Sequence, residues 1–533
     1  MKWTKKTRLV FAAIALCLWT AACFVFFQYF YPDHLFYQEQ NQLFLISGEY
    51  VNSYFDKPAW LACLIGDFLT QFFYYVYAGA TIVTLAILVT GMLMWHALRR
   101  CGAGRIAFIA ALVLMTVLAV FHFDIFYKLS SDIAVAGGIV VFIVFDAISR
   151  HIRRWRNSSC LLLLAVCLCL SYWMFGNGCW LTALLAIVGA FLLKSSFRWM
   201  SLLSLPMIVA VAVVFGNRHY RLHTADNMKY PGIGRFTAPD FMLERELHVD
   251  NEYYFGNYNR VVNFVRSQEQ PTAGMSFFYN LCMARKGELP DHLFDLSTTE
   301  LGTLYKIGPE TPMLVIKQMN ELYYLLGDMT FTERAAMMGN VFSADNRNVR
   351  MIRRLADANL VSGDTVAANK YLRLLEKTMI YKKWAQQRIP GKMTPEIKAE
   401  IAYKQKFLNK TDTLQVGDNT HIMMTELIKS NPDNITALDY TLCTMLLLKD
   451  IKGFKRDYDL YCMDNGRPRT KSLYQQALMI YLASTNAPQE EWDKYITNQA
   501  LLQRFQTYSQ RRGDPAFRDT YWYFYDKLKA AVY

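Results

Sequence analysis

Two patterns of hydrophobic and polar residues divide the chain, and they change over near residue 216. Before this point, long apolar runs alternate with short polar or basic stretches. A helix needs about 20 apolar residues to cross the hydrocarbon of a bilayer. We therefore predict about seven membrane spans, at residues 9–30, 76–98, 106–123, 133–149, 159–175, 179–194 and 199–215.

The basic residues of this part favour one orientation. Thirteen of the fifteen Lys and Arg residues in 1–216 lie in four clusters at alternate span ends, and only Lys57 and Lys128 lie in the other loops. Positive charge collects on the cytoplasmic side of a membrane. The N-terminus is therefore expected inside and the C-terminal part outside. The apolar stretch 58–98 then holds one span, preceded by an interfacial amphipathic helix at 59–75.

The second part has the composition of a soluble helical domain, which we place at 243–533 after a linker at 217–242. Three apolar segments end in glycine and an acid, at Gly287, Gly327 and Gly363, and 431–450 is a degenerate fourth unit. Helix pairs at such a period resemble tetratricopeptide (TPR) repeats, in which each pair buries its apolar face on its neighbours. A helical domain without a repeat is the alternative. The predicted fold class is all-α: a membrane bundle followed by a TPR-like domain.

Composition excludes several other classes of protein. With 53% hydrophobic residues, the chain is neither disordered nor a small disulfide scaffold. The net charge of +13 does not indicate a nucleic-acid partner, because about half of it flanks the predicted spans and the rest is dispersed. The expected partners are the lipid bilayer and a protein bound by the helical-repeat domain.

The first outer loop, 31–58, carries the residues best suited to chemistry. Asp33 lies at the outer end of the first span, and Asp56, Lys57 and Pro58 close the loop. A carboxylate at such a site can accept a proton from a hydroxyl group. A nearby ammonium can offset the charge of a phosphate leaving group.

This loop resembles the first outer loop of membrane glycosyltransferases of the GT-C type, especially the aminoarabinose-transferase and protein O-mannosyltransferase-like group. That loop runs approximately P-D-E-x-x-Y-x-E, then S-G-D-W, then [YF]-[DE]-K-P. The matching residues are Pro32, Asp33, Tyr37, Glu39, Ser47-Gly48-Glu49 and Phe55-Asp56-Lys57-Pro58. The whole chain also resembles an uncharacterised family of polytopic membrane proteins from Bacteroides-like bacteria.

The GT-C resemblance implies roles for individual residues. Asp33 would be the catalytic base that activates the acceptor. Asp56 would be a metal or donor-site carboxylate, and Lys57 would lie near the donor phosphate. Tyr37 and Glu39 would belong to the same donor-binding site.

The family also has an acid in its second outer loop, and here Asp124 or Asp132 could fill that position. A divalent metal ion, held by Asp56 with Asp124 or Asp132, would be the cofactor, because hard divalent cations prefer oxygen ligands. Each of these acids also has an ordinary alternative as a helix cap or a solvated loop residue.

Two classes of function remain open. The first is a glycosyltransferase that moves a sugar from a polyprenyl-phosphate donor to an acceptor at the outer face of a bacterial inner membrane. The second is a non-enzymatic scaffold, in which the multi-pass bundle anchors a periplasmic TPR-like domain that assembles a complex of the cell envelope. Only the first requires the outer-loop acids to meet at one site.

Overall fold

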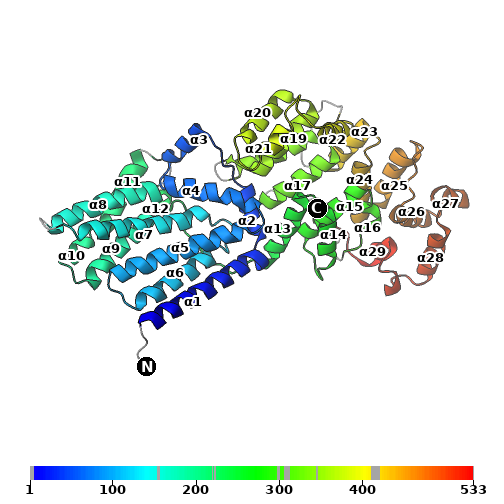
Figure 1. Cartoon of the computed structure of the whole chain (residues 1–533). Coiled ribbons are helices and arrows are strands. Elements are labelled where there is room, and N and C mark those ends of the chain that lie inside the picture. The colour runs from blue at the N-terminus through cyan, green and yellow to red at the C-terminus, as the bar shows by residue number, and fades with distance from the viewer. Residues whose placement is uncertain are drawn as a thin grey trace. The chain divides into compact units, whose positions relative to one another are not determined.

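The computed structural model describes residues 5–152, 156–218, 220, 224–296, 301–304, 313–343, 346–409 and 420–531. Helices are the only regular elements in these residues, so the predicted all-α class is confirmed (Figure 1). The chain forms two compact units. Unit 1 comprises Met1–Glu244 with Lys377–Lys382, and unit 2 comprises Arg245–Glu376 with Lys383–Tyr533.

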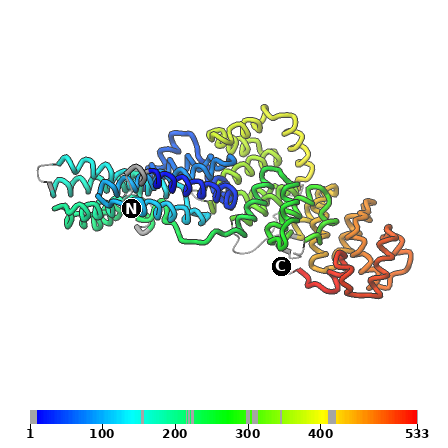
Figure 2. The backbone as a smooth tube through the Cα atoms, turned by 60° about the horizontal axis from the view of Figure 1, so that its bottom comes forward, coloured from blue at the N-terminus to red at the C-terminus, as the bar shows by residue number. Residues whose placement is uncertain are grey.

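Unit 1 contains the apolar helices, which run back and forth beside one another (Figure 2). Its elements are α1 (Lys5–Val25), η1 (Phe26–Phe30), α2 (Asp33–Gln40), α3 (Gly48–Asn52), η2 (Ser53–Asp56), α4 (Trp60–Thr70), η3 (Gln71–Tyr74), α5 (Ala78–Arg100), α6 (Ile106–Phe121), α7 (Leu129–Ser149), α8 (Arg156–Phe175), α9 (Gly178–Leu192), α10 (Arg198–Ser201), α11 (Ser204–Arg218) and α12 (Thr224–Lys229).

Four helical segments of the described chain are long and apolar enough to cross a membrane: Val10–Phe30, Ala78–Arg100, Leu129–Ser149 and Asn157–Phe175. The prediction of about seven such spans is therefore corrected to four. The other three predicted spans fall on α6, α9 and α10–α11, which are shorter apolar helices. The 16 residues of α6 rise about 24 Å, less than the roughly 30 Å of hydrocarbon.

Helix α7 lies at the centre of this bundle and packs against α4, α5, α8 and α9. Glycines permit a close approach between α7 and α9. A Cβ atom added to Gly138 would lie 2.1 Å from the carbonyl oxygen of Gly178. Small residues at such crossings let membrane helices pack backbone to backbone. Within the predicted interfacial segment 59–75, Gly66 of α4 approaches Ser130 of α7 in the same way, so α4 is packed against the bundle.

Unit 2 is built from helices around one large core. Its elements are the remainder of α13 (Phe241–Tyr254), then α14 (Tyr258–Arg266), α15 (Ala273–Lys286), α16 (Leu289–His292), η4 (Leu301–Thr303), α17 (Met313–Leu326), α18 (Met329–Val341), α19 (Val349–Ser362), α20 (Thr365–Glu376), α21 (Lys382–Gln386), α22 (Pro395–Gln405), α23 (Thr420–Ser430), α24 (Ile435–Leu447), α25 (Ile451–Tyr458), η6 (Asp459–Met463), α26 (Ser472–Ser484), α27 (Gln489–Tyr495), α28 (Gln499–Gln510), η7 (Pro515–Phe517) and α29 (Tyr521–Lys527).

The glycine-acid pattern marks helix ends in this unit as the sequence predicts. Gly287, Gly327 and Gly363 follow α15, α17 and α19, with φ of +71°, +86° and +86°. Glycine takes this left-handed conformation without the steric cost of a Cβ atom. Lys449 holds the equivalent place after α24, with φ of +58°.

The acid after each of these positions starts the next helix in three of the four units. The carboxylate of Asp328 accepts a hydrogen bond from the backbone N–H of Phe331. Asp364 and Asp450 accept corresponding bonds at the starts of α20 and α25. Successive helices α17, α18, α19 and α20 pack against one another in chain order. The helix pairs are therefore real, while their identity as TPR units stays a prediction.

Candidate functional site

The predicted catalytic base, Asp33, is the first residue of α2 and is partly exposed. The backbone N–H groups of Asp33 and His34 both donate to the carboxylate of Glu244, the second at 3.2 Å. Glu244 therefore serves as an acceptor for the free N–H groups at this helix start. The imidazole of His34 is buried, with Nδ1 3.5 Å from Glu244 Oε2.

Two further residues of the predicted donor site, Tyr37 and Glu39, lie inside the protein. The Tyr381 hydroxyl donates to the Glu39 carboxylate, with distances of 2.8 and 2.9 Å to its two oxygens. The same segment, 377–382, also accepts a backbone hydrogen bond from Ile46 through the carbonyl of Lys377. Glu39 is only 2% exposed, so its carboxylate is engaged within unit 1.

Asp56 and Lys57 lie at the end of η2, where Asp56 is exposed and Lys57 is partly buried. Burial raises the pKa of the Cys63 thiol to about 12, while the charges of Lys128 and Lys57 act to lower it. The charges of Lys57 and Lys128 therefore both act on this thiol of α4.

The acids of the second outer loop have structural partners. Asp124 accepts a hydrogen bond from the backbone N–H of Phe126 at 2.9 Å. Asp132 is fully buried and bonds the Tyr127 hydroxyl and the His122 Nε2, both at 2.7 Å. Among the described residues, no three His, Cys, Asp or Glu side chains are grouped so as to hold a metal ion. Asp56, Asp124 and Asp132 therefore do not form such a group of three, and the metal site and the transferase stay predictions.

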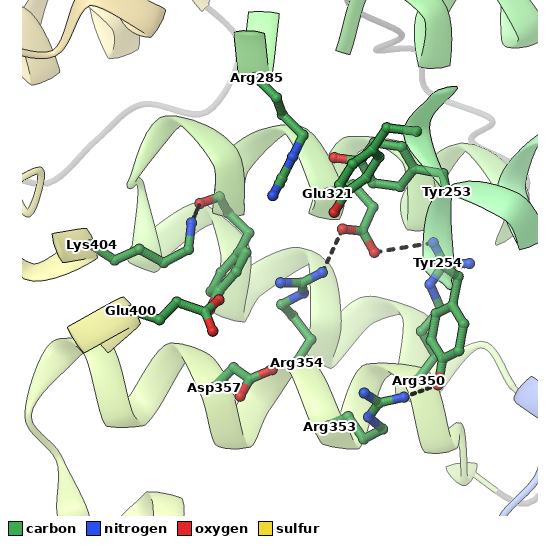
Figure 3. Close-up of a pocket in the computed structure, with 12 residues that line it drawn as sticks. Tyr253, Tyr254, Arg285, Glu321, Arg350, Arg353, Arg354, Asp357, Glu400 and Lys404 are labelled. Atoms are coloured by element: carbon green, nitrogen blue, oxygen red, sulfur yellow. Dashed lines mark hydrogen bonds and ion pairs between the residues drawn. The ribbon is translucent and has the colours of Figure 1, made fainter. Parts of the chain in front are cut away.

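A different site, which the sequence reasoning missed, lies wholly within unit 2. It is a cavity of about 170 Å³ between α13, the start of α14, α15, α17, α19 and α22 (Figure 3). Its walls are polar and carry five cationic side chains, three carboxylates and four tyrosines. They are Arg285, Arg350, Arg353, Arg354, Lys404, Glu321, Asp357, Glu400, Tyr253, Tyr254, Tyr258 and Tyr324. We call this the arginine pocket.

The floor of the arginine pocket is a buried ion network. Arg350 Nη1 lies 2.7 Å from Asp250 Oδ2, and its Nη2 lies 3.1 Å from Glu321 Oε1. Arg354 Nη2 lies 2.5 Å from the other oxygen of Glu321. Burial raises the pKa of Glu321, but the charges of Arg354 and Arg350 outweigh it and hold that pKa below its usual value. The carboxylate thus stays ionised and fixes both guanidinium groups.

Aromatic rings hold the other cations in place. The Arg354 guanidinium lies 3.9 Å from the ring centre of Tyr324, and the Lys404 ammonium lies 4.0 Å from the same centre. Arg285 lies 4.4 Å from the ring centre of Tyr258. Arg353 donates to the Tyr254 hydroxyl. A cation over an aromatic face is stabilised electrostatically by the ring.

Arg285 and Lys404 differ from Arg350 and Arg354 in their partners. Within the described chain, neither Arg285 nor Lys404 has a carboxylate oxygen within 4.0 Å. Lys404 Nζ donates instead to the backbone carbonyl of Tyr324, at 3.0 Å. Burial, followed by the positive charges of Arg354 and Arg285, lowers the pKa of Lys404 to about 8. Figure 3 shows Arg285, Arg354 and Lys404 pointing toward one another across the cavity.

The arrangement can bind an anion. Asp357 is engaged by Arg388, whose Nε lies 3.2 Å from its carboxylate, and Glu321 is shared by two arginines. The pocket therefore keeps more positive than negative charge. Part of this site is visible in the sequence, because the R-x-x-R-R-x-x-D pattern from Arg350 to Asp357 places charged residues on one side of α19. The cations that face it come from α15 and α22, which no local pattern connects.

Comparison with known proteins identifies the family of the chain. Residues 6–527 match a family of unknown function, DUF6057, so the chain belongs to that family across almost its whole length. No curated protein and no solved structure matches it.

Proposed function

We propose that the chain is a membrane-anchored binding protein whose unit 2 holds the anionic group of a ligand in the arginine pocket. Like the scaffold, which is one of the two functions that the sequence leaves open, this function is non-enzymatic. A single observation carries the proposal: Arg285 and Lys404, which have no carboxylate oxygen within 4.0 Å among the described residues, converge with Arg354 on one cavity.

Electrostatics explains why this arrangement favours an anion. Like charges brought together repel, and the lowered pKa of Lys404 records this repulsion together with burial. An anion placed between the three cations removes the repulsion. Because the pocket walls reduce the local dielectric, each of these interactions is stronger than it would be in water.

The network beneath the cavity prepares the site before a ligand arrives. Glu321 holds Arg354 from below, and the Tyr324 ring supports both Arg354 and Lys404. Side chains fixed in this way lose little conformational entropy on binding. The pocket is therefore a preorganised site rather than a set of mobile surface charges.

The test measures anion binding by the full-length protein in lipid nanodiscs, using isothermal titration with inorganic phosphate and with succinate. We expect at least one of these anions to bind, and Arg285→Gln and Lys404→Gln to weaken that binding at least tenfold. The matched control is Lys398→Gln, which removes an exposed charge from the same helix, α22. Binding that is absent, or equal in all four proteins, would overturn the proposal.

For the membrane part, we propose that α6, α9 and α10–α11 complete the bundle as short spans, so that seven spans place unit 2 outside the cytoplasm. Their apolar composition and the packing of α6 on α5 and of α9 on α7 support this. The charge bias of the loops supports the same orientation. A C-terminal fusion to a reporter that is active only outside the cytoplasm should be active. An inactive reporter on a stable fusion would refute this topology.

A further inference from the structure

Resting on the proposed function, we infer that the arginine pocket selects a phosphate monoester group over a carboxylate. The three converging cations come from three different helices: Arg285 from α15, Arg354 from α19 and Lys404 from α22. They approach the cavity from different directions (Figure 3). The shape and charge of the anion that fits between them follow from this arrangement.

The different directions from which the three cations approach favour a tetrahedral anion over a planar one. A carboxylate is planar and is best bound by one guanidinium that donates two parallel hydrogen bonds in its plane. A phosphate presents three terminal oxygens that point in separate directions. Arg285, Arg354 and Lys404 can each approach a different oxygen. The lysine fits this scheme because an ammonium binds phosphate as a point charge without a required plane.

The net charge of the pocket also favours a phosphate group. The lining carries five cations and three carboxylates, and counting the ion-pair partners Asp250 and Arg388 gives six cations and four carboxylates, an excess of two positive charges. A phosphate monoester carries about −1.5 to −2 charge at neutral pH. A single carboxylate carries one negative charge and would leave one cation without a partner. The dianion therefore matches this excess of two positive charges.

Space and ring contacts indicate that the pocket holds the phosphate and little else. Its volume of about 170 Å³ is well below the roughly 300–1,000 Å³ of pockets that enclose a whole small molecule. The faces of Tyr258 and Tyr324 are already covered by Arg285, Arg354 and Lys404, so they do not stack on a ligand ring. The remainder of the ligand then lies toward the exposed rim.

The pH dependence of binding distinguishes a phosphate ligand from a carboxylate ligand. Lys404 faces Arg354 and Asp357 on α19, Arg285 on α15 and Tyr324 on α17, with Glu400 on its own helix. A phosphate monoester takes up its second proton with a pKa of about 6. Phosphate binding should weaken about fourfold between pH 7.5 and 5.5, because the dianion fraction falls by that factor. A carboxylate ligand, with a pKa near 4, stays ionised.

The experiment titrates the full-length protein in nanodiscs with glycerol 3-phosphate, glycerate and succinate. We expect glycerol 3-phosphate to bind at least tenfold more tightly than either carboxylate, and to lose about fourfold in affinity at pH 5.5. Lys404→Gln and Arg285→Gln should each weaken its binding at least tenfold, with Lys398→Gln unchanged. Lys404→Arg, which keeps the charge, should restore most of the affinity, and circular dichroism should be the same for every variant.

A second arm identifies the source of the phosphate group. Nanodiscs containing phosphatidic acid are compared with nanodiscs lacking it, with soluble glycerol 3-phosphate as the competitor. If soluble glycerol 3-phosphate binds, the phosphate group belongs to a free phosphorylated molecule. If phosphatidic acid in the nanodisc alone occupies the pocket, the phosphate group belongs to a lipid headgroup. Both outcomes support the inference. Equal or tighter binding of glycerate or succinate would overturn the phosphate inference and leave the proposed function standing. If no anion binds, both fail.

Discussion

Replacing Glu321 with glutamine should destabilise unit 2 more than any other single amide substitution in the arginine pocket. The two oxygens of Glu321 bind Arg350 and Arg354, at 3.1 and 2.5 Å, and the side chain is 9% exposed. Removing one partner of a buried ion pair costs about 3–5 kcal/mol, because the other charge remains buried. Arg350 keeps its contact with Asp250, so we expect the lower end, about 3 kcal/mol.

Hydrogen–deuterium exchange of the full-length protein measures this effect locally. A loss of about 3 kcal/mol corresponds to about 100-fold faster exchange of protected amides in α17 and α19. The control is Glu376→Gln, which breaks the more exposed Arg373–Glu376 pair and should cost less than about 1 kcal/mol. Acceleration below threefold in α19, or equal effects of the two substitutions, would refute the reasoning.

The pH dependence of this difference follows from the pKa of Glu321, which lies below its usual value in the folded state. A group with a depressed folded-state pKa contributes stability above its unfolded pKa and loses it as pH falls through the folded value. The difference between wild type and Glu321→Gln should therefore be constant from about pH 5 to 8. It should shrink only below the unfolded pKa of about 4.3.

Three further predictions address single positions. Burial raises the pKa of Asp328 to about 6, so the stability of the α17–α18 pair should fall by about 2 kcal/mol as pH rises from 4.5 to 7.5. In hydrogen-exchange measurements, Asp328→Asn should abolish this fall. The control, Asp364→Asn at the exposed equivalent position, should leave it unchanged. Gly327→Ala should lower the thermal midpoint more than Gly363→Ala, because both have φ of +86° but only the first places a Cβ atom 2.6 Å from another side chain. Asp33→Asn should complement a deletion strain, since its contact with Glu244 is made by its backbone N–H; a persistent glycan defect at normal protein level would instead support the transferase.

The helix ends of unit 2 could be predicted because they depend on local chemistry. Gly287, Gly327 and Gly363 end helices where only a left-handed residue continues the chain without strain, and this preference is written in the residue type. Lys449 shows the limit of the pattern, because it takes the same conformation without being glycine. The apolar runs likewise predicted helices, since hydropathy is a property of each segment.

The number of long spans and the state of the outer-loop residues could not be predicted in the same way. A run of apolar residues does not show where its helix ends, and α6 ends at Phe121 after 16 residues. Glu39 matched a motif, but its carboxylate is bound by Tyr381, 342 residues away in the chain. No local pattern contains such a pair.

By itself, the sequence determined that the chain is helical, that its first part is apolar enough for a membrane and that three helices of its second part end at glycine. These properties follow from residue type and short-range spacing. The tertiary structure alone decided that Arg285, Arg354 and Lys404 share one cavity. Charge convergence depends on how α15, α19 and α22 pack, and packing is set by the whole core rather than by the segments that carry the charges.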